Sequence, residues 1–214
     1  MTAKITPTIF VNTVEALQER LELYEAITKR VQIDVADKSF TVNPTIAVEK
    51  SLSQPTTIKR DMHLMVEEPI EYLETCAQAG VSLVIGHIEN MSDQKEFVQR
   101  ARELGVGVGL AVDLDTPMND LDWTVAKTAD LILIMAVRAG KEGQLFNRKV
   151  LERIQWLRKK GFTGEICVDG GVNETTIKPC VKAGADVLAV GSCLWKAADP
   201  AAKLHQLQEL IHAF

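Results

Sequence analysis

Eight short stretches rich in β-branched and other apolar residues recur along the chain, and polar or amphipathic segments separate them. Most are continuous apolar runs without strict alternation of apolar and polar positions. Such runs are typical of strands that are buried on both faces of a parallel sheet. The pattern predicts eight strands, at residues 4–10, 30–36, 57–66, 81–88, 106–114, 129–137, 164–171 and 185–192.

The segments between these stretches carry a helical period, with apolar residues at three- and four-residue steps. Several end on a glycine, which is the usual C-cap of a helix. Alternation of strands with helices predicts an α/β fold, a (β/α)₈ TIM barrel formed by one domain over residues 1–214. A doubly wound open sheet is the alternative. The clearest helices are predicted at residues 14–29, 69–80, 93–105, 147–161, 174–184 and 200–214.

Composition excludes several classes of protein and partner. Apolar residues make up 46% and charged residues 25% of the chain, which excludes intrinsic disorder and a collagen-like fibre. The net charge of -5 provides no general attraction to nucleic acid or to an anionic membrane, so an anionic ligand needs a local site. The first residues lack the apolar run of a signal peptide, and no run approaches the length of a membrane span, so we expect a cytoplasmic protein.

The cysteines show no CxxC pair and lie in apolar surroundings. We therefore expect buried, reduced thiols rather than disulfides or a zinc site. They are Cys76, Cys167, Cys180 and Cys193.

Polar residues stand at the ends of the predicted strands. In a barrel of this kind the carboxyl ends of the strands carry the active site, so these residues are the candidates for chemistry. They are Thr8, Gln32, Asp34, Asp37, His63, His87, Asp113, Arg138, Asp169 and Ser192.

Two carboxylates and a histidine stand out among these candidates. Asp34 and Asp169 belong to the second and seventh predicted strands and could flank a ligand from opposite sides, which suits two-base proton transfer at one carbon. Either aspartate alone could instead cap a helix. His63 could shuttle protons or satisfy a core hydrogen bond, but together the three residues form a ligand set suited to a divalent transition metal. His87 is a candidate for substrate contact or for support of the ligands, and a structural role is equally open.

Glycine-containing segments follow the last three predicted strands, at residues 138–144, 169–174 and 190–192. Backbone amides exposed by glycine bind phosphate in many barrels, and these loops should converge at one side of the mouth. The sequence therefore predicts a phosphate site there. The candidate substrate and phosphate residues are Thr8, His63, Gly140, Gly143, Gly170, Gly171, Gly191 and Ser192.

Several of these segments resemble one family over essentially the whole chain. The matching pieces are PTIF, QIDVADKSF, DMHLMVEEP, GHIE, LIMAVRAGKEGQLF, VDGGVNETT and AGADVLAVGS, of which DMHLMVEEP and VDGGVN are the most specific. The chain resembles ribulose-phosphate 3-epimerase. The resemblance implies a metal-dependent (β/α)₈ barrel that interconverts ribulose 5-phosphate and xylulose 5-phosphate, or one that acts on allulose 6-phosphate as related members do.

The resemblance also implies roles for individual residues. Asp34 and Asp169 would be the acid/base pair and metal ligands, and His63 a further ligand. Gln32 stands where the family usually has a histidine, and its amide oxygen is a weaker ligand for zinc, manganese or iron than an imidazole. Thr8 replaces the usual serine.

Two loops depart from the pattern of the family. The usual MDG after the first aspartate reads ADK here, and the loop that normally reads close to NPGFGGQ is RAGKEGQ. In the second loop, Arg138 and Lys141 add cationic groups near the expected phosphate.

The leading hypothesis is a phosphosugar epimerase. One aspartate removes the proton next to the ketone, an enediolate forms, and the other aspartate returns a proton to the opposite face. The alternatives are a catalytically silent barrel that binds a sugar phosphate, and a different lyase or isomerase on the same barrel. We expect a small sugar phosphate as partner, neither nucleic acid nor membrane, and a homo-oligomeric assembly.

Overall fold

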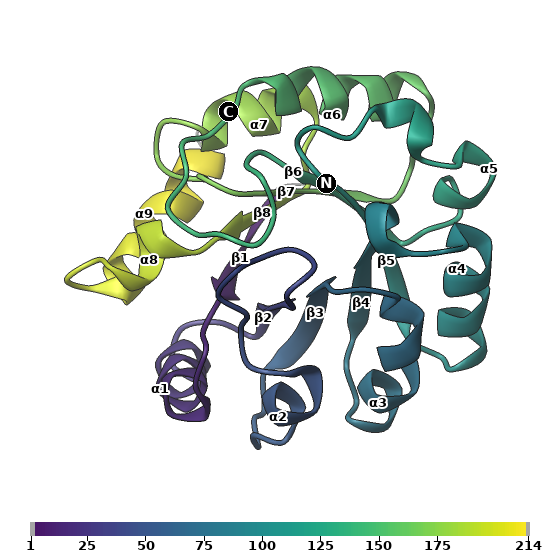
Figure 1. Cartoon of the computed structure of the whole chain (residues 1–214). Coiled ribbons are helices and arrows are strands. Elements are labelled where there is room, and N and C mark those ends of the chain that lie inside the picture. The colour runs from purple at the N-terminus through teal and green to yellow at the C-terminus, as the bar shows by residue number, and fades with distance from the viewer. Residues whose placement is uncertain (1–2, 213–214) are drawn as a thin grey trace.

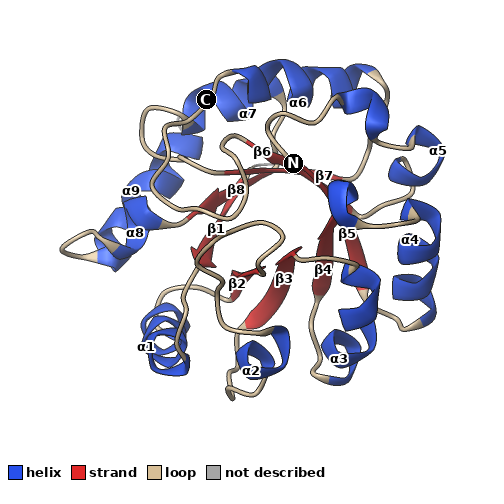
Figure 2. Cartoon of the chain, viewed as in Figure 1, coloured by secondary structure: helices blue, strands red, loops and turns tan. Residues whose placement is uncertain are grey.

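The computed structural model describes residues 3–212, which form a closed barrel of eight parallel strands surrounded by helices (Figures 1 and 2). Each strand pairs with the next one in the sequence, and the last pairs with the first. The predicted barrel is thus confirmed and the open sheet is excluded. The strands are β1 Lys4–Ile9, β2 Arg30–Ala36, β3 Lys59–Met65, β4 Leu83–His87, β5 Gly107–Val112, β6 Leu131–Met135, β7 Glu165–Asp169 and β8 Val187–Val190.

The six predicted helices are all present within the described residues, and residues 213 and 214 of the last one lie outside them. The sequence pattern missed α2, α5 and α8, because helices of five residues or fewer are too short to show a period. The α-helices are α1 Val14–Glu25, α2 Val48–Leu52, α3 Leu73–Gln78, α4 Gln94–Glu103, α5 Trp123–Ala126, α6 Lys149–Lys159, α7 Ile177–Ala183, α8 Ser192–Trp195 and α9 Pro200–His212, and the 3₁₀ turns are η1 Pro69–Tyr72, η2 Ile88–Asn90 and η3 Met118–Asp120.

Side-chain caps fix where several of these helices begin. The hydroxyl of Thr13 accepts the backbone N–H of Ala16 at the start of α1, and the carboxylate of Asp93 accepts two N–H groups at the start of α4. These bonds satisfy donors that have no partner inside the helix. At the other end of α7, Gly184 takes a left-handed conformation with a φ of 111°, as a C-capping glycine does.

Two apolar layers cover the two faces of the sheet. Outward residues such as Ile132 and Ile134 pack against the helices in the larger core. Alternate residues of the same strands, such as Leu131 and Leu133, form a smaller core inside the barrel. Burial of both faces explains why the strands read as continuous apolar runs.

The inside of the barrel is polar along β1, β2, β3 and β7, and this polar side is divided into two levels. At the amino ends of the strands, Arg30 pairs with Asp61 and Lys4 with Glu165. We call these four residues the amino-end cluster. Toward the carboxyl ends lies a second group, which we call the carboxyl-end cluster. It consists of Gln32, Asp34, His63 and Asp169.

Two further sequence expectations concern the cysteines and the helices. All four cysteines are free thiols; Cys76, Cys167 and Cys180 are buried and Cys193 is partly exposed. Among residues 3–212 there is no helix with the length and apolar character that crossing a membrane requires.

Candidate active site

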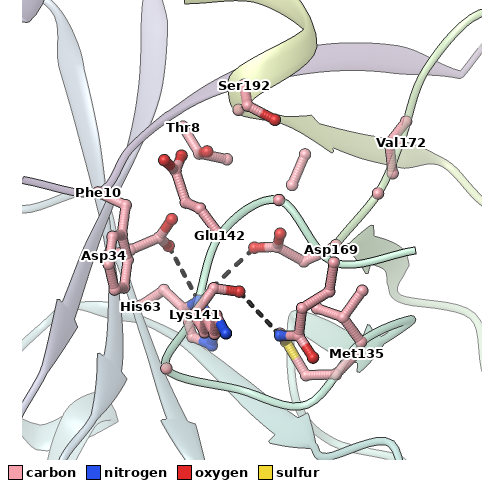
Figure 3. A pocket seen from close by; sticks show the side chains of 18 of the residues that line it. Thr8, Phe10, Asp34, His63, Met135, Lys141, Glu142, Asp169, Val172 and Ser192 are labelled. Carbon is pink, nitrogen blue, oxygen red and sulfur yellow. Dashed lines mark hydrogen bonds and ion pairs between the residues drawn. The ribbon is translucent and has the colours of Figure 1, made fainter. Parts of the chain in front are cut away.

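The carboxyl-end cluster brings Asp34, His63 and Asp169 together, as the sequence suggested (Figure 3). The register of β2 and β3 places Asp34 directly beside His63. Nδ1 of His63 lies 3.0 Å from Oδ1 of Asp34 and 3.6 Å from Oδ2 of Asp169. One donor atom from each of the three residues fits within 4.8 Å.

Gln32 links the two carboxylates across the barrel. Its Nε2 donates to Oδ1 of Asp34 at 2.7 Å and to Oδ2 of Asp169 at 2.5 Å. A primary amide has two N–H donors, so one group satisfies both bonds. Rotation about the last side-chain torsion would turn Oε1 toward the same cluster, where it could serve as a neutral ligand.

Behind His63, a chain of hydrogen bonds determines which ring nitrogen of its neutral imidazole carries the lone pair. Nε2 of His63 lies 2.9 Å from Nε2 of His87, and Nδ1 of His87 lies 2.9 Å from Oε2 of Glu89. An ionised carboxylate only accepts, so His87 carries its proton on Nδ1 and accepts from His63 through Nε2. In neutral His63, Nδ1 therefore presents a lone pair to Asp34 and Asp169. His87 thus supports the cluster, and Glu89, which the sequence reasoning missed, completes the chain.

The cluster concentrates negative charge and attracts a positive one. Burial lowers the pKa of His63, but the hydrogen bond and the charge of Asp34 outweigh it and leave that pKa raised. Burial, with the charge of Asp34 next in importance, raises the pKa of Asp169 to about 7. In the described part of the chain, Asp34 and Asp169 form ion pairs with His63 alone. A group that titrates near neutral pH can both take and give a proton in the cell.

The same donor set fits a divalent metal ion. Two carboxylate oxygens and an imidazole lone pair are ligands that zinc, manganese and iron accept. In neutral His63, the lone pair on Nδ1 lies 3.0–3.6 Å from oxygens of the two carboxylates, so electron-rich atoms face one another. Only a proton, a hydrogen-bond donor or a metal ion between them makes this arrangement favourable. The residues that could hold the ion are Asp34, His63 and Asp169, with Gln32 beside them.

One cavity at the carboxyl ends of the strands unites these residues with the predicted phosphate residues. Gln32 is the member of the cluster that does not line the cavity. Sequence reasoning missed the apolar lining, including Phe10 and Met135, because nothing in an apolar residue marks it as part of a site. The predicted residues that line the cavity are Thr8, Asp34, His63, Gly140, Gly143, Asp169, Gly170, Gly171, Gly191 and Ser192.

Glycine is required where the loops at the mouth pack closely. Gly170 and Gly171 have φ values of 100° and 66°, which side-chain-bearing residues rarely adopt. A Cβ on Gly170 would stand 2.4 Å from Cγ2 of Val137, and one on Gly171 would stand 2.8 Å from the backbone nitrogen of Phe146. The absence of side chains lets the loop after β7 lie against the loop after β6.

The remaining strand-end candidates hold loops rather than line the cavity. Asp37 accepts the backbone N–H groups of Ser39 and Glu67, and Asp113 accepts that of Ala139. Arg138 pairs with Asp115 at 2.7 Å, with both side chains largely exposed. Of the two cations expected near a phosphate, Lys141 alone lines the cavity.

Comparison with known proteins agrees with this geometry. The family model described as "Ribulose-phosphate 3 epimerase family" matches residues 4–195. A ribulose-phosphate 3-epimerase of Schizosaccharomyces pombe is 34% identical over 204 residues, covering 92% of this chain and 89% of that protein. The cytoplasmic isoform of ribulose-phosphate 3-epimerase from Oryza sativa subsp. japonica is 33% identical over 186 residues, covering 85% of this chain and 82% of that protein.

Among solved structures, the crystal structure of 3-hexulose-6-phosphate synthase from Salmonella typhimurium matches with a TM-score of 0.70 and 16% identity, covering 98% of each chain. This likeness shows the shared barrel fold. The match of the family model over most of the chain, with relatives that are a third identical, establishes more: the chain belongs to the ribulose-phosphate 3-epimerase family.

Proposed function

We propose that this chain epimerises ribulose 5-phosphate to xylulose 5-phosphate by two-base proton transfer at carbon 3. The observation that carries the proposal is the pairing of Asp34 and Asp169. They come from strands far apart in the barrel, yet a single amide group contacts both at 2.5–2.7 Å at the base of one cavity. Membership of the epimerase family supports the same reading.

The two aspartates carry the proton transfer in this proposal. An ionised carboxylate removes the proton from carbon 3, and the other, protonated, gives a proton to the opposite face of the enediolate. A raised pKa of about 7 for Asp169 favours a pair that holds one proton near neutral pH. Gln32 donates to both carboxylates and so keeps them in position in both directions of the reaction.

Asp34, His63 and Asp169 would hold a divalent ion of zinc, manganese or iron, and Gln32 would add Oε1 only by giving up its two hydrogen bonds to the carboxylates. When bound, the ion supplies positive charge next to the oxygens that become negative in the enediolate. The His87–Glu89 pair keeps the Nδ1 lone pair of His63 directed at this position.

The glycine loops would anchor the phosphate at the other side of the cavity. Gly143, Gly170, Gly171, Gly191 and Ser192 line that side, and backbone N–H groups in such loops bind phosphate oxygens. Thr8, at the end of β1, would meet the sugar.

Turnover and metal content, measured on protein purified without chelator, test this function. We expect conversion of ribulose 5-phosphate, loss of activity on treatment with chelator, and recovery when one of the three metals returns. Conversion of allulose 6-phosphate alone would reassign the substrate within the same chemistry. Binding of both sugars without turnover of either, in metal-loaded protein, would contradict the proposal and favour a silent barrel.

A further inference from the structure

The loop after β6 sends one acidic side chain into the cavity. Glu142 lines the cavity together with Thr8, Gly191 and Ser192. Its Oε1 lies 3.1 Å from the position that a Cβ on Gly191 would occupy, and Thr8 Oγ1 lies 2.8 Å from the same point. Figure 3 shows the carboxylate of Glu142 pointing toward Thr8, on the side of the cavity where Ser192 lies.

Burial and the charge of Asp34 raise the pKa of this carboxylate, and they outweigh the groups nearby that favour its charge. The positive charges of Lys196 and Arg20 and the side chain of Trp195 act in the direction that lowers this pKa. Arg20 is itself held over the ring of Trp195, with its guanidinium carbon 3.9 Å from the ring centroid. Cations that could serve a ligand's phosphate thus act on a side chain of the protein.

We propose that Glu142 acts as an internal anion in the phosphate subsite, and that its carboxylate must withdraw before the phosphate of a substrate can bind. Glu142 is then a specificity-determining residue that sets the affinity for phosphate. The inference rests on the proposed function for the identity of the subsite, but it concerns a residue that takes no part in the proton transfer.

Electrostatic repulsion opposes a phosphate and the Glu142 carboxylate occupying the subsite together. A phosphate near Gly191 and Ser192 would stand a few ångströms from the Glu142 carboxylate, and like charges at such a distance repel strongly near a protein surface. Burial and the charge of Asp34 already raise the pKa of Glu142, so the carboxylate is held in a place where negative charge is unfavourable. A second anion adds to that cost, and moving Glu142 away removes it.

The loop around Glu142 is bonded within itself and has space at its tip. Glycines with φ values of 86° and 76° flank Glu142, at Gly140 and Gly143. Nε2 of Gln144 donates to the carbonyl oxygens of Arg138 and Lys141 at 2.7 and 2.8 Å, which holds the segment between them together. Gly143 is exposed, and a Cβ there would meet no atom within 4 Å, so the tip of the loop has space around it.

Calorimetric titration with inorganic phosphate tests the proposal on the wild type, Glu142→Gln and Glu142→Ala. Glutamine keeps the size of the side chain but has no charge. We expect both variants to bind phosphate roughly tenfold or more tightly than the wild type. Glu67→Gln is the matched control, because Glu67 is exposed just after β3 at the same end of the barrel. It should leave the affinity unchanged.

The outcomes separate the proposal from its rivals. Wild-type affinity in Glu142→Gln overturns it, even if Glu142→Ala binds more tightly, because the obstruction would then be one of volume. Equal tightening in Glu67→Gln overturns it as well, because the effect would be a general one of charge. Absence of phosphate binding in all of these proteins would overturn both the subsite and the proposal.

The fluorescence of Trp195 provides a second measurement, which reports whether phosphate displaces Glu142. In a Trp123→Phe/Trp156→Phe background, Trp195 is the remaining tryptophan of the chain. Phosphate should change its emission when Glu142 is present, and much less in Glu142→Ala. Phosphate binding with unchanged emission would contradict withdrawal of Glu142. Neither measurement needs turnover, so a protein that shows both effects without epimerising ribulose 5-phosphate would refute the proposed function and leave this inference intact.

Discussion

The two polar clusters inside the barrel differ in charge balance although they share strands β2, β3 and β7. In the amino-end cluster each carboxylate has a cation: Oδ2 of Asp61 accepts from Nε of Arg30 at 2.6 Å, and Glu165 pairs with Lys4. In the carboxyl-end cluster, Asp34 and Asp169 share an uncharged amide and a histidine. The same barrel interior thus holds one neutralised cluster and one with unbalanced negative charge.

Burial alone therefore does not distinguish the carboxylates of the two clusters. Burial raises the pKa of Asp61 to about 6 even though Arg30 opposes it, and raises that of Asp169 to about 7. The partners make the difference. An arginine commits Asp61 to an ion pair, whereas Asp169 is left to exchange a proton or bind a metal ion. The comparison predicts that matched substitutions in the two clusters have different effects.

The largest expected effect is on turnover. Asp169→Asn keeps the shape of the side chain and removes the proton acceptor, so we expect turnover of ribulose 5-phosphate to fall by about 10²–10⁴-fold. Its stability against unfolding should be equal to or above that of the wild type at pH 7, because a buried charge is removed. Asp61→Asn is the matched control, and its turnover should stay within a few-fold of wild type. Comparable loss of turnover in both variants would break the comparison.

A smaller effect is expected on stability at the amino end. Arg30→Met leaves Asp61 buried without its cation and should lower the free energy of unfolding at pH 8 by about 3 kcal/mol. Asp61 has a raised folded pKa of about 6, so the stability it contributes as a neutral acid is lost as pH rises through that value. Above that pH, the ionised carboxylate of Asp61 pairs with Arg30 in the wild type and has no cation in the variant. Urea unfolding at pH 5 and pH 8 should show the deficit mainly at pH 8.

The double variant Arg30→Met/Asp61→Asn controls that experiment. It has neither charge, so the deficit at pH 8 should largely disappear. A deficit of the same size at both pH values, or one that persists in the double variant, would assign the effect to lost packing of the arginine stem.

The smallest of the expected effects concerns metal affinity at the carboxyl end. Gln32→His offers an imidazole where the chain has an amide, and should tighten zinc or manganese binding by about tenfold in a calorimetric titration. Gln54→His, far from the cluster in sequence, corrects for metal binding by any added histidine. No gain over that control would mean that residue 32 is not at the ligand position.

The sequence was sufficient for the barrel and for the clustering of Asp34, His63 and Asp169. Continuous apolar runs report strands buried on both faces, and Asp34, His63 and Asp169 stand out because a charged or polar residue interrupts or ends such a run. The fold then places strand ends side by side, so proximity follows from topology.

Other features lay beyond the reach of the sequence. Nothing in the order of residues shows that Gln32 bridges two carboxylates, since that contact spans 137 positions between β2 and β7. Glu142 and Arg138 lie four positions apart in the same loop, yet one lines the cavity and the other pairs with Asp115. The direction of a loop side chain depends on the packing of neighbouring loops, which a local pattern does not contain.

Solvent deuterium exchange at carbon 3 of ribulose 5-phosphate tests the central claim, that Asp34 and Asp169 transfer this proton, most directly. The wild type in deuterium oxide should incorporate deuterium at that carbon in both epimers, while Asp34→Asn and Asp169→Asn should each stop epimerisation, with the phosphate still bound. No exchange in wild type with substrate bound would contradict the epimerase account. Exchange that survives in both variants would show that other residues carry the proton, with His63 and His87 the next to test.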